Sequence, residues 1–191
     1  MKYVPNVLTI GRIVVTPIML VLLYSDTLVG ISGALVLFVL AAISDYLDGR
    51  IARQYKVGSR IGQFLDPLAD KVLVLGTFVV FAIMIPRIVP WWGVGLIALR
   101  DAGVTGLRSW VESQGLSLRT LPMAKAKTAA QLTFLIAMLV VLTAEKTSGG
   151  ASEIAMWILA SWVPFAAFLL VMLVTVLTGL AYFVRLDYSS Q

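Results

Sequence analysis

Residues 154–184 contain no charged side chain, and this stretch constrains the fold more than any other feature of the sequence. A helix that crosses the hydrocarbon core of a bilayer needs about 20 predominantly apolar residues, and this stretch is longer than that. We expect the excess to be taken up by tilt, by projection from the membrane, or by a kink near Pro164. A membrane protein is therefore the first interpretation.

Five shorter apolar stretches precede this one, at 7–24, 28–44, 72–85, 88–99 and 129–144. Only 13% of the chain is Asp, Glu, Lys or Arg, whereas a soluble domain usually carries about 25%. Such a chain cannot cover itself with a polar surface, which excludes a soluble globular enzyme and a disordered chain. We predict an all-α fold with six transmembrane helices, forming a single membrane domain over residues 1–191.

The basic residues indicate how these stretches are oriented. All of the 15 Lys and Arg residues except Arg87 and Lys146 lie in four places: near the start of the chain, between the second and third stretches, between the fourth and fifth, and after the sixth. Six spans bring these places to one side, which the positive-inside rule makes cytoplasmic. We expect a cell-membrane protein with both termini in the cytoplasm. The net charge of +5 then reflects membrane orientation rather than binding to nucleic acid.

Four aspartates flank the join between the second and third stretches: Asp45, Asp48, Asp66 and Asp70. Their i, i+3 and i, i+4 spacings place each pair on one helix face, about 4.5 to 6 Å apart along the axis. Converging carboxylates repel one another, and a divalent cation relieves that repulsion. Because the chain has no His or Cys, these ligands favour Mg²⁺, Mn²⁺ or Ca²⁺, and four aspartates could bridge two ions. The alternative is a solvated cluster paired with Arg50, Arg53 and Lys71.

The pattern around these aspartates resembles the signature of the CDP-alcohol phosphotransferase family. Asp45-x-x-Asp48-Gly49-x-x-Ala52-Arg53 is followed, after eight residues, by Gly62-x-x-x-Asp66-x-x-x-Asp70. The resemblance implies a six-helix membrane enzyme that transfers the substituted phosphoryl group of a CDP-linked alcohol to an acceptor hydroxyl and releases CMP. It also implies that the four aspartates bind two divalent cations, Mg²⁺ or Mn²⁺. Asp70 would in addition be the general base.

A second set of residues is expected to contact the CDP-lipid. The resemblance assigns Gly49 and Arg53 to the nucleotide and its diphosphate. Glycine also lets a phosphate or sugar approach the backbone closely, although glycines more often serve packing or turns. The full set of expected contacts is Asn6, Thr9, Gly49, Arg53, Ser59 and Gly62. Because no side chain stands out as a covalent nucleophile, we expect one in-line displacement. Family members are commonly homodimers, and we expect a homodimer here.

A second basic cluster bears on the acceptor: Arg100, Arg108, Lys125 and Lys127. Cations beside a metal site favour an anionic acceptor, such as a phosphorylated polyol, and the alternative is an anchor to anionic lipid head groups. The segments PNVLTIGR, GQFLDPLADK, LRDAGVTGLR, KAKTAAQ and GLAYFVR resemble the family branch that uses CDP-diacylglycerol and sn-glycerol 3-phosphate. Asp101 and Ala124 depart from that branch, which usually has Glu and Gly at these positions.

Three other interpretations remain open at this stage. A sister enzyme would use the same chemistry with inositol phosphate, serine or phosphatidylglycerol as the acceptor. A transporter or channel would place acidic residues across the depth of the bilayer, whereas the four aspartates lie at one helix boundary. A structural membrane protein with metal-linked helices would leave Arg53, Gly62 and the second basic cluster without a role.

Overall fold

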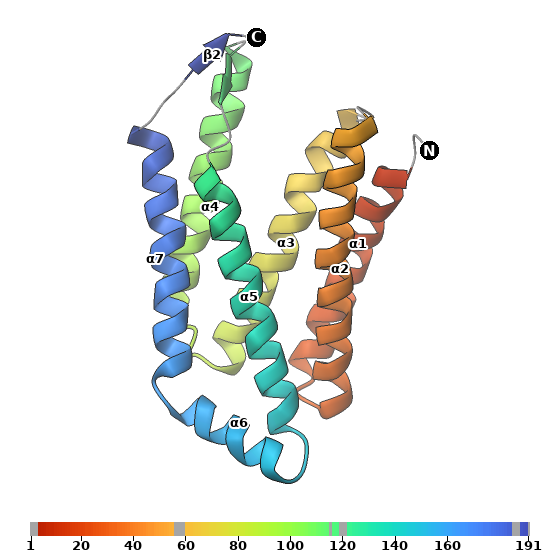
Figure 1. Cartoon of the computed structure of the whole chain (residues 1–191), viewed down its shortest axis with the longest axis vertical. Helices are drawn as coiled ribbons and strands as arrows, with labels where there is room; N and C mark the ends of the chain where they lie inside the picture. Colours follow the sequence, from red (N-terminus) through yellow and green to blue (C-terminus); the bar gives the residue numbers. More distant parts are fainter. Residues whose placement is uncertain (1–3, 56–59, 115, 119–121, 185–187, 191) are drawn as a thin grey trace.

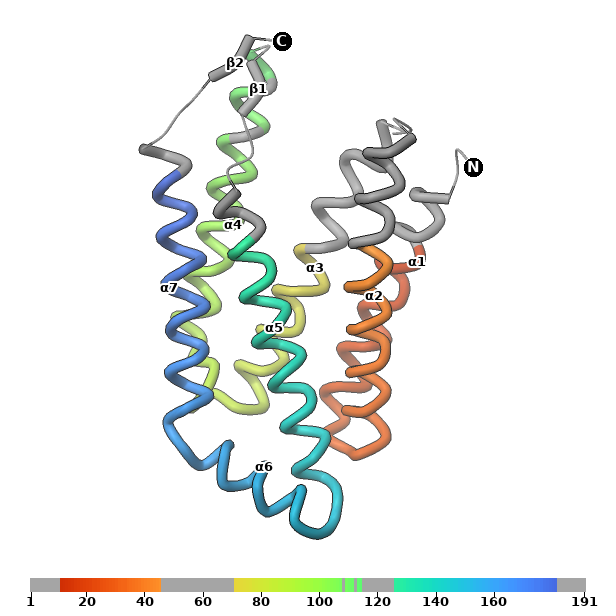
Figure 2. Tube along the Cα trace, viewed as in Figure 1, coloured from red at the N-terminus to blue at the C-terminus, as the bar shows by residue number. Residues whose placement is uncertain are grey.

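The computed structural model is a bundle of long helices with one short helix across an end (Figure 1). It describes residues 4–55, 60–114, 116–118, 122–184 and 188–190, and side chains within 11–45, 71–107, 109–111, 113–114 and 126–181 (coloured in Figure 2). The helices in this part of the chain are α1 (Val4–Tyr24), α2 (Leu28–Tyr55), α3 (Arg60–Met84), α4 (Trp91–Ser113), α5 (Pro122–Glu145), α6 (Gly150–Ala160) and α7 (Val163–Val184). The predicted all-α fold class is confirmed.

Two strands of three residues each accompany the helices and were not predicted. They are β1 (Leu116–Leu118) and β2 (Tyr188–Ser190), which pair antiparallel. This pairing joins the segment after α4 to the segment after α7. The result is a two-stranded sheet beside the helices of the described chain.

The long helices alternate in direction along the chain (Figure 1). α1 packs against α2 and α3, α2 packs against α5, and α7 packs against both α4 and α5. Three aromatic rings from α3, α5 and α7 meet in the core, with centroids 5.9 to 6.0 Å apart: Phe78, Phe134 and Phe168. The core therefore connects α3 with α5 and α7.

Helix α7 shows that the bundle is built for an apolar surrounding. Its buried stripe is Phe168, Val171, Thr175 and Thr178, and its exposed stripe is Leu170, Leu173, Leu177 and Leu180. A helix of a soluble protein turns its apolar stripe toward the core and its polar residues outward. α7 instead buries two hydroxyls beside Phe168 and Val171 and turns four leucines outward, which is expected when lipid is the solvent.

Three helical segments are long and apolar enough to cross a membrane by length and composition: Leu28–Asp45, Ala126–Glu145 and Val163–Ala181. The apolar parts of α1 and α3 that the structure describes, Gly11–Tyr24 and Lys71–Met84, are shorter. These findings support a membrane protein. The predicted total of six spans stays a prediction.

The sixth apolar stretch is two helices rather than one. α6 ends at Ala160, and Ser161 caps it in an extended conformation (φ −77°, ψ 169°). Pro164 falls in the first turn of α7, where its missing N–H costs nothing. The predicted kink is a full break at Ser161 and Trp162, and α6 lies across the end of the bundle (Figure 1).

Candidate active site

Asp45 is the first of the four predicted metal ligands, and it lies on α2 beside Arg12 of α1. The Arg12 Nη1 donates a hydrogen bond to the Asp45 Oδ1 at 2.5 Å. The Arg12 side chain is only 2% exposed, whereas that of Asp45 is 45% exposed. A carboxylate has two oxygens with about four acceptor sites, so a hydrogen bond from arginine is compatible with a cation on the same group. Asp45 is therefore both oriented by a buried partner and reachable from outside the bundle.

The other three predicted ligands lie on α2, the helix of Asp45, and on α3, the next helix along the chain. Asp48 belongs to α2, and Asp66 and Asp70 belong to α3, but their side chains are outside the described part of the chain. No group of three carboxylates occurs among the described side chains, which do not include these three aspartates. Carboxylates alone, in a chain without His or Cys, fit a hard divalent cation. The two-metal site stays a prediction.

Six residues are predicted to contact the CDP-lipid. All six lie outside 11–45, 71–107, 109–111, 113–114 and 126–181, the ranges whose side chains the structure describes: Asn6, Thr9, Gly49, Arg53, Ser59 and Gly62. Their assigned roles stay predictions.

Arg100 of α4 and Lys127 of α5, two of the predicted acceptor-binding cations, meet at Asp101. The Arg100 Nη1 lies 2.9 Å from the Asp101 Oδ1, and the Lys127 Nζ lies 2.8 Å from the Asp101 Oδ2. All three side chains are at most 12% exposed. One carboxylate therefore orders two cations, and the three groups together carry a net charge of +1.

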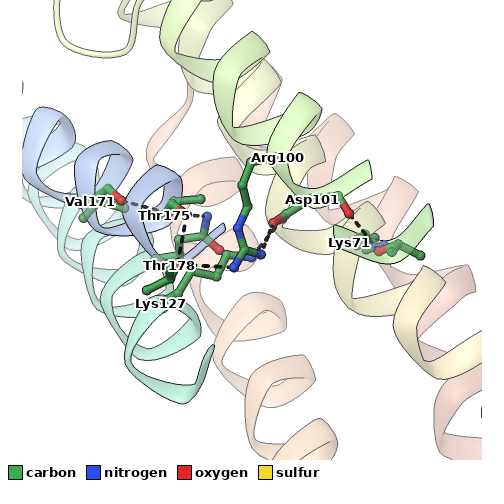
Figure 3. A network of polar contacts seen from close by, with 9 residues as sticks. Lys71, Arg100, Asp101, Lys127, Val171, Thr175 and Thr178 are labelled. Carbon is green, nitrogen blue, oxygen red and sulfur yellow. Dashed lines mark hydrogen bonds and ion pairs between the residues drawn. The ribbon is translucent and has the colours of Figure 1, made fainter. Parts of the chain in front are cut away.

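A layer of hydroxyl and amide groups on α5 and α7 continues this network (Figure 3). The Arg100 Nη2 donates to the Thr178 Oγ1 at 3.2 Å. Thr178 in turn donates to the backbone oxygen of Thr175, and the buried Gln131 donates to the Thr175 hydroxyl at 3.2 Å. These groups satisfy one another inside the bundle, which is needed because an unpaired polar group is costly there.

The network also reaches α3, the helix that carries Asp66 and Asp70. The Lys71 Nζ donates to the Thr105 hydroxyl, which donates to the backbone oxygen of Asp101 at 2.7 Å. Lys71 directly follows Asp70 in the sequence. A chain of hydrogen bonds thus connects Lys71, the first α3 residue whose side chain the structure describes, with the Arg100–Asp101–Lys127 cluster.

The sequence predicted part of this arrangement and missed part of it. Arg100 and Lys127 come together at Asp101, while the side chains of Arg108 and Lys125 are outside the described residues. The acceptor-binding role of all four stays a prediction. The partners Arg12, Asp101 and Thr178 were not predicted. A charge within an apolar stretch is a signal for a buried functional pair, and it could have identified Arg12. Nothing local marks Thr178, whose partner lies 78 positions away.

Comparison with known proteins places the chain in a family. The model of the CDP-alcohol phosphatidyltransferase family matches residues 2–168. The chain belongs to this family, which confirms the resemblance seen in the aspartate signature. Membership of a transferase family also removes the support for the channel and structural-protein interpretations.

The most similar relatives include proteins named CDP-diacylglycerol–glycerol-3-phosphate 3-phosphatidyltransferase. The one from Rickettsia typhi is 37% identical over 191 residues, which cover 96% of each chain. The one from Rickettsia prowazekii is 36% identical over 190 residues, covering 95% of this chain and 94% of that one. A cardiolipin synthase (CMP-forming) of Oryza sativa is 35% identical over 147 residues, covering 71% of this chain and 45% of the relative.

Proposed function

We propose that this chain transfers the phosphatidyl group of CDP-diacylglycerol to sn-glycerol 3-phosphate, giving phosphatidylglycerol phosphate and CMP. The observation that carries the proposal is the largely buried pair of cations, Arg100 and Lys127, with side chains 11% and 12% exposed, linked through Lys71 to the helix of Asp66 and Asp70. An anionic acceptor near the aspartate signature needs such a pair. Similarity to two Rickettsia proteins named for this reaction, over almost their whole length, supports the choice.

The reaction is one in-line displacement at phosphorus. The acceptor oxygen forms a bond to the phosphorus that carries diacylglycerol, the bond from that phosphorus to CMP breaks, and the acceptor proton passes to Asp70. Asp45, Asp48, Asp66 and Asp70 hold two divalent cations, Mg²⁺ or Mn²⁺, which supply positive charge against the diphosphate when bound. Arg12 fixes the orientation of the Asp45 carboxylate through its 2.5 Å hydrogen bond.

The donor and the acceptor occupy different residues in this scheme. The CDP-lipid contacts Asn6, Thr9, Gly49, Arg53, Ser59 and Gly62. The acceptor phosphate binds Arg100 and Lys127, together with Arg108 and Lys125. The last two are needed because the Arg100–Asp101–Lys127 cluster has a net charge of only +1, whereas a phosphate monoester is largely dianionic at neutral pH.

The directions of the helices and the placement of the basic residues bear on the membrane topology. We propose that residues 1–191 form one membrane domain in which the six long helices cross the membrane, with both termini and the site on the cytoplasmic side. Support comes from the alternating directions of these helices and from the placement of all but two of the Lys and Arg residues. We also propose a homodimer, on the family resemblance alone.

The second candidate is the same chemistry with phosphatidylglycerol as acceptor. The relative from Oryza sativa that is named a cardiolipin synthase favours it. That match covers less than half of the relative, whereas the matches to the Rickettsia proteins cover nearly all of theirs. Inositol phosphate and serine remain alternatives within the same chemistry.

The test is CMP release by detergent-purified protein with CDP-diacylglycerol and Mg²⁺ or Mn²⁺. Glycerol 3-phosphate, inositol 1-phosphate, serine and phosphatidylglycerol are supplied in separate reactions. We expect metal-dependent release with glycerol 3-phosphate, lost in Asp70→Asn and retained in Asp26→Asn, which changes an exposed aspartate between α1 and α2. Release only with another acceptor would keep the chemistry and overturn the proposed acceptor.

A further inference from the structure

The Arg100 side chain, from Cγ to Nε, lies directly against the backbone of α7 at Gly179. A Cβ atom added at Gly179 would lie 2.5 Å from the Arg100 Cγ and 2.9 Å from its Nε. Real Cβ atoms essentially never approach other atoms closer than 3.0 Å. The present position of Arg100 therefore requires glycine at position 179.

Two of the three guanidinium nitrogens of Arg100 have polar partners, and the third, the Nε, lies against the backbone at Gly179. The Nη1 is paired with Asp101, and the Nη2 donates to Thr178. The Nε is buried and has no hydrogen-bond partner within the part of the chain that the structure describes. Three neighbours thus fix the position of Arg100: the Asp101 carboxylate on its own helix, and the Thr178 hydroxyl and the Gly179 backbone on α7.

We propose that Thr178 and Gly179 are positioning residues that set the affinity for the anionic acceptor by holding Arg100 in place. This inference rests on the proposed function, and it extends the acceptor site to the last helix. Both residues lie beyond residues 2–168, the part of the chain that the family model matches. Neither is expected to touch the acceptor, because their contacts are to Arg100 and to the helix itself.

The principal test is Gly179→Ala, with Gly95→Ala as the matched control. Gly95 lies on α4, and an added Cβ there would meet nothing within 4 Å. Displacement of a binding group by about 1 Å can cost up to 10²-fold, so we expect roughly a tenfold rise in the KM for glycerol 3-phosphate in Gly179→Ala. The KM for CDP-diacylglycerol should stay at the wild-type value, and Gly95→Ala should match wild type in both constants.

A second pair of variants tests the hydroxyl without adding volume. Thr178→Val removes the acceptor of the Arg100 hydrogen bond, whereas Thr178→Ser keeps it. We expect the KM for glycerol 3-phosphate to rise at least several-fold in Thr178→Val, since one hydrogen bond to a charged group is lost. Thr178→Ser should restore the wild-type value. This pair decides the matter if Gly179→Ala does not fold.

The possible outcomes separate this inference from the proposed function. Wild-type protein that releases no CMP with glycerol 3-phosphate overturns the proposed function, and the inference with it. Wild-type turnover, with an unchanged KM for glycerol 3-phosphate in Gly179→Ala and Thr178→Val, overturns only the inference. An equal rise of both KM values in these variants also overturns it, because a packing role of α7 would then suffice.

Discussion

Two aspartates, one about midway along α4 and one between α1 and α2, each pair with a lysine at almost the same distance, in very different surroundings. Asp101 pairs with Lys127 at 2.8 Å, and Asp26 pairs with Lys146 at 3.0 Å. The side chains of the first pair are 6% and 12% exposed, whereas those of the second are 55% and 25% exposed. Burial, not distance, therefore separates them. An exposed ion pair contributes little to the free energy of unfolding, whereas breaking a buried pair leaves an uncompensated charge inside the protein.

The largest expected effect comes from making the same substitution at both aspartates. Asp101→Asn removes the buried counter-charge of Arg100 and Lys127, whose side chains are only 11% and 12% exposed, and we expect a loss of about 3–5 kcal/mol in the free energy of unfolding. Asp26→Asn should cost about 1 kcal/mol or less. The measurement is the thermal unfolding midpoint of both variants in one detergent. Equal shifts would show that burial does not distinguish the two pairs.

Arg12 and Asp45 form an intermediate case, since only the cation is buried. If Arg12 orients a metal ligand, Arg12→Gln should raise the Mg²⁺ concentration for half-maximal CMP release by about 10- to 100-fold. Arg87→Gln is the matched control, because Arg87 is exposed on the connection between α3 and α4. An unchanged metal requirement in Arg12→Gln, with activity retained, would rule out that role for Arg12.

A double substitution sharpens the account of the buried cluster. Lys127→Met in the Asp101→Asn background removes one of the two stranded cations, so it should restore part of the lost stability. We expect a coupling free energy of about 1–3 kcal/mol between the two positions, read from the unfolding midpoints of the four proteins of the cycle. Simple additivity would mean that Asp101 stabilises the fold without neutralising Lys127.

The smallest expected effect is a pH dependence at the exposed pair. The hydrogen bond to Asp26, followed by the charges of Glu145 and Asp26, raises the pKa of Lys146 above its ordinary value of 10.5, against the opposing effect of desolvation. A raised folded-state pKa stabilises the protein fully below pH 10.5, and the contribution is lost as the pH rises through the folded-state pKa. The unfolding midpoints of wild type and Lys146→Met should therefore differ slightly below pH 10.5 and converge above it. A difference that grows with pH would contradict this assignment.

The fold class was predictable because the signal was long and repeated. Apolar stretches and few charges indicate helices in lipid without any knowledge of tertiary contacts. The division of the last stretch into α6 and α7 was only partly predictable. Pro164 signals a local disturbance, but a kink and a full break fit the same sequence, and the break depends on how Ser161 caps α6.

The site was predictable in its residue types and less so in its contacts. The choice of Arg100 and Lys127 followed from their charge and their place between the fourth and fifth apolar stretches. The part played by Asp101 did not follow, because its position next to Arg100 gives no indication that Lys127 on α5 shares the same carboxylate. Thr178 was not predicted, because its partner Arg100 lies 78 positions away in the sequence.

The sequence by itself determined the membrane setting, the helical class and the family, since composition, periodicity and a spaced motif are properties of the chain alone. The tertiary structure decided which groups meet: Arg12 with Asp45, Arg100 and Lys127 with Asp101, and Arg100 with the glycine backbone of α7. These contacts join helices that are distant in sequence. Their energies depend on burial, which arises only when the helices pack.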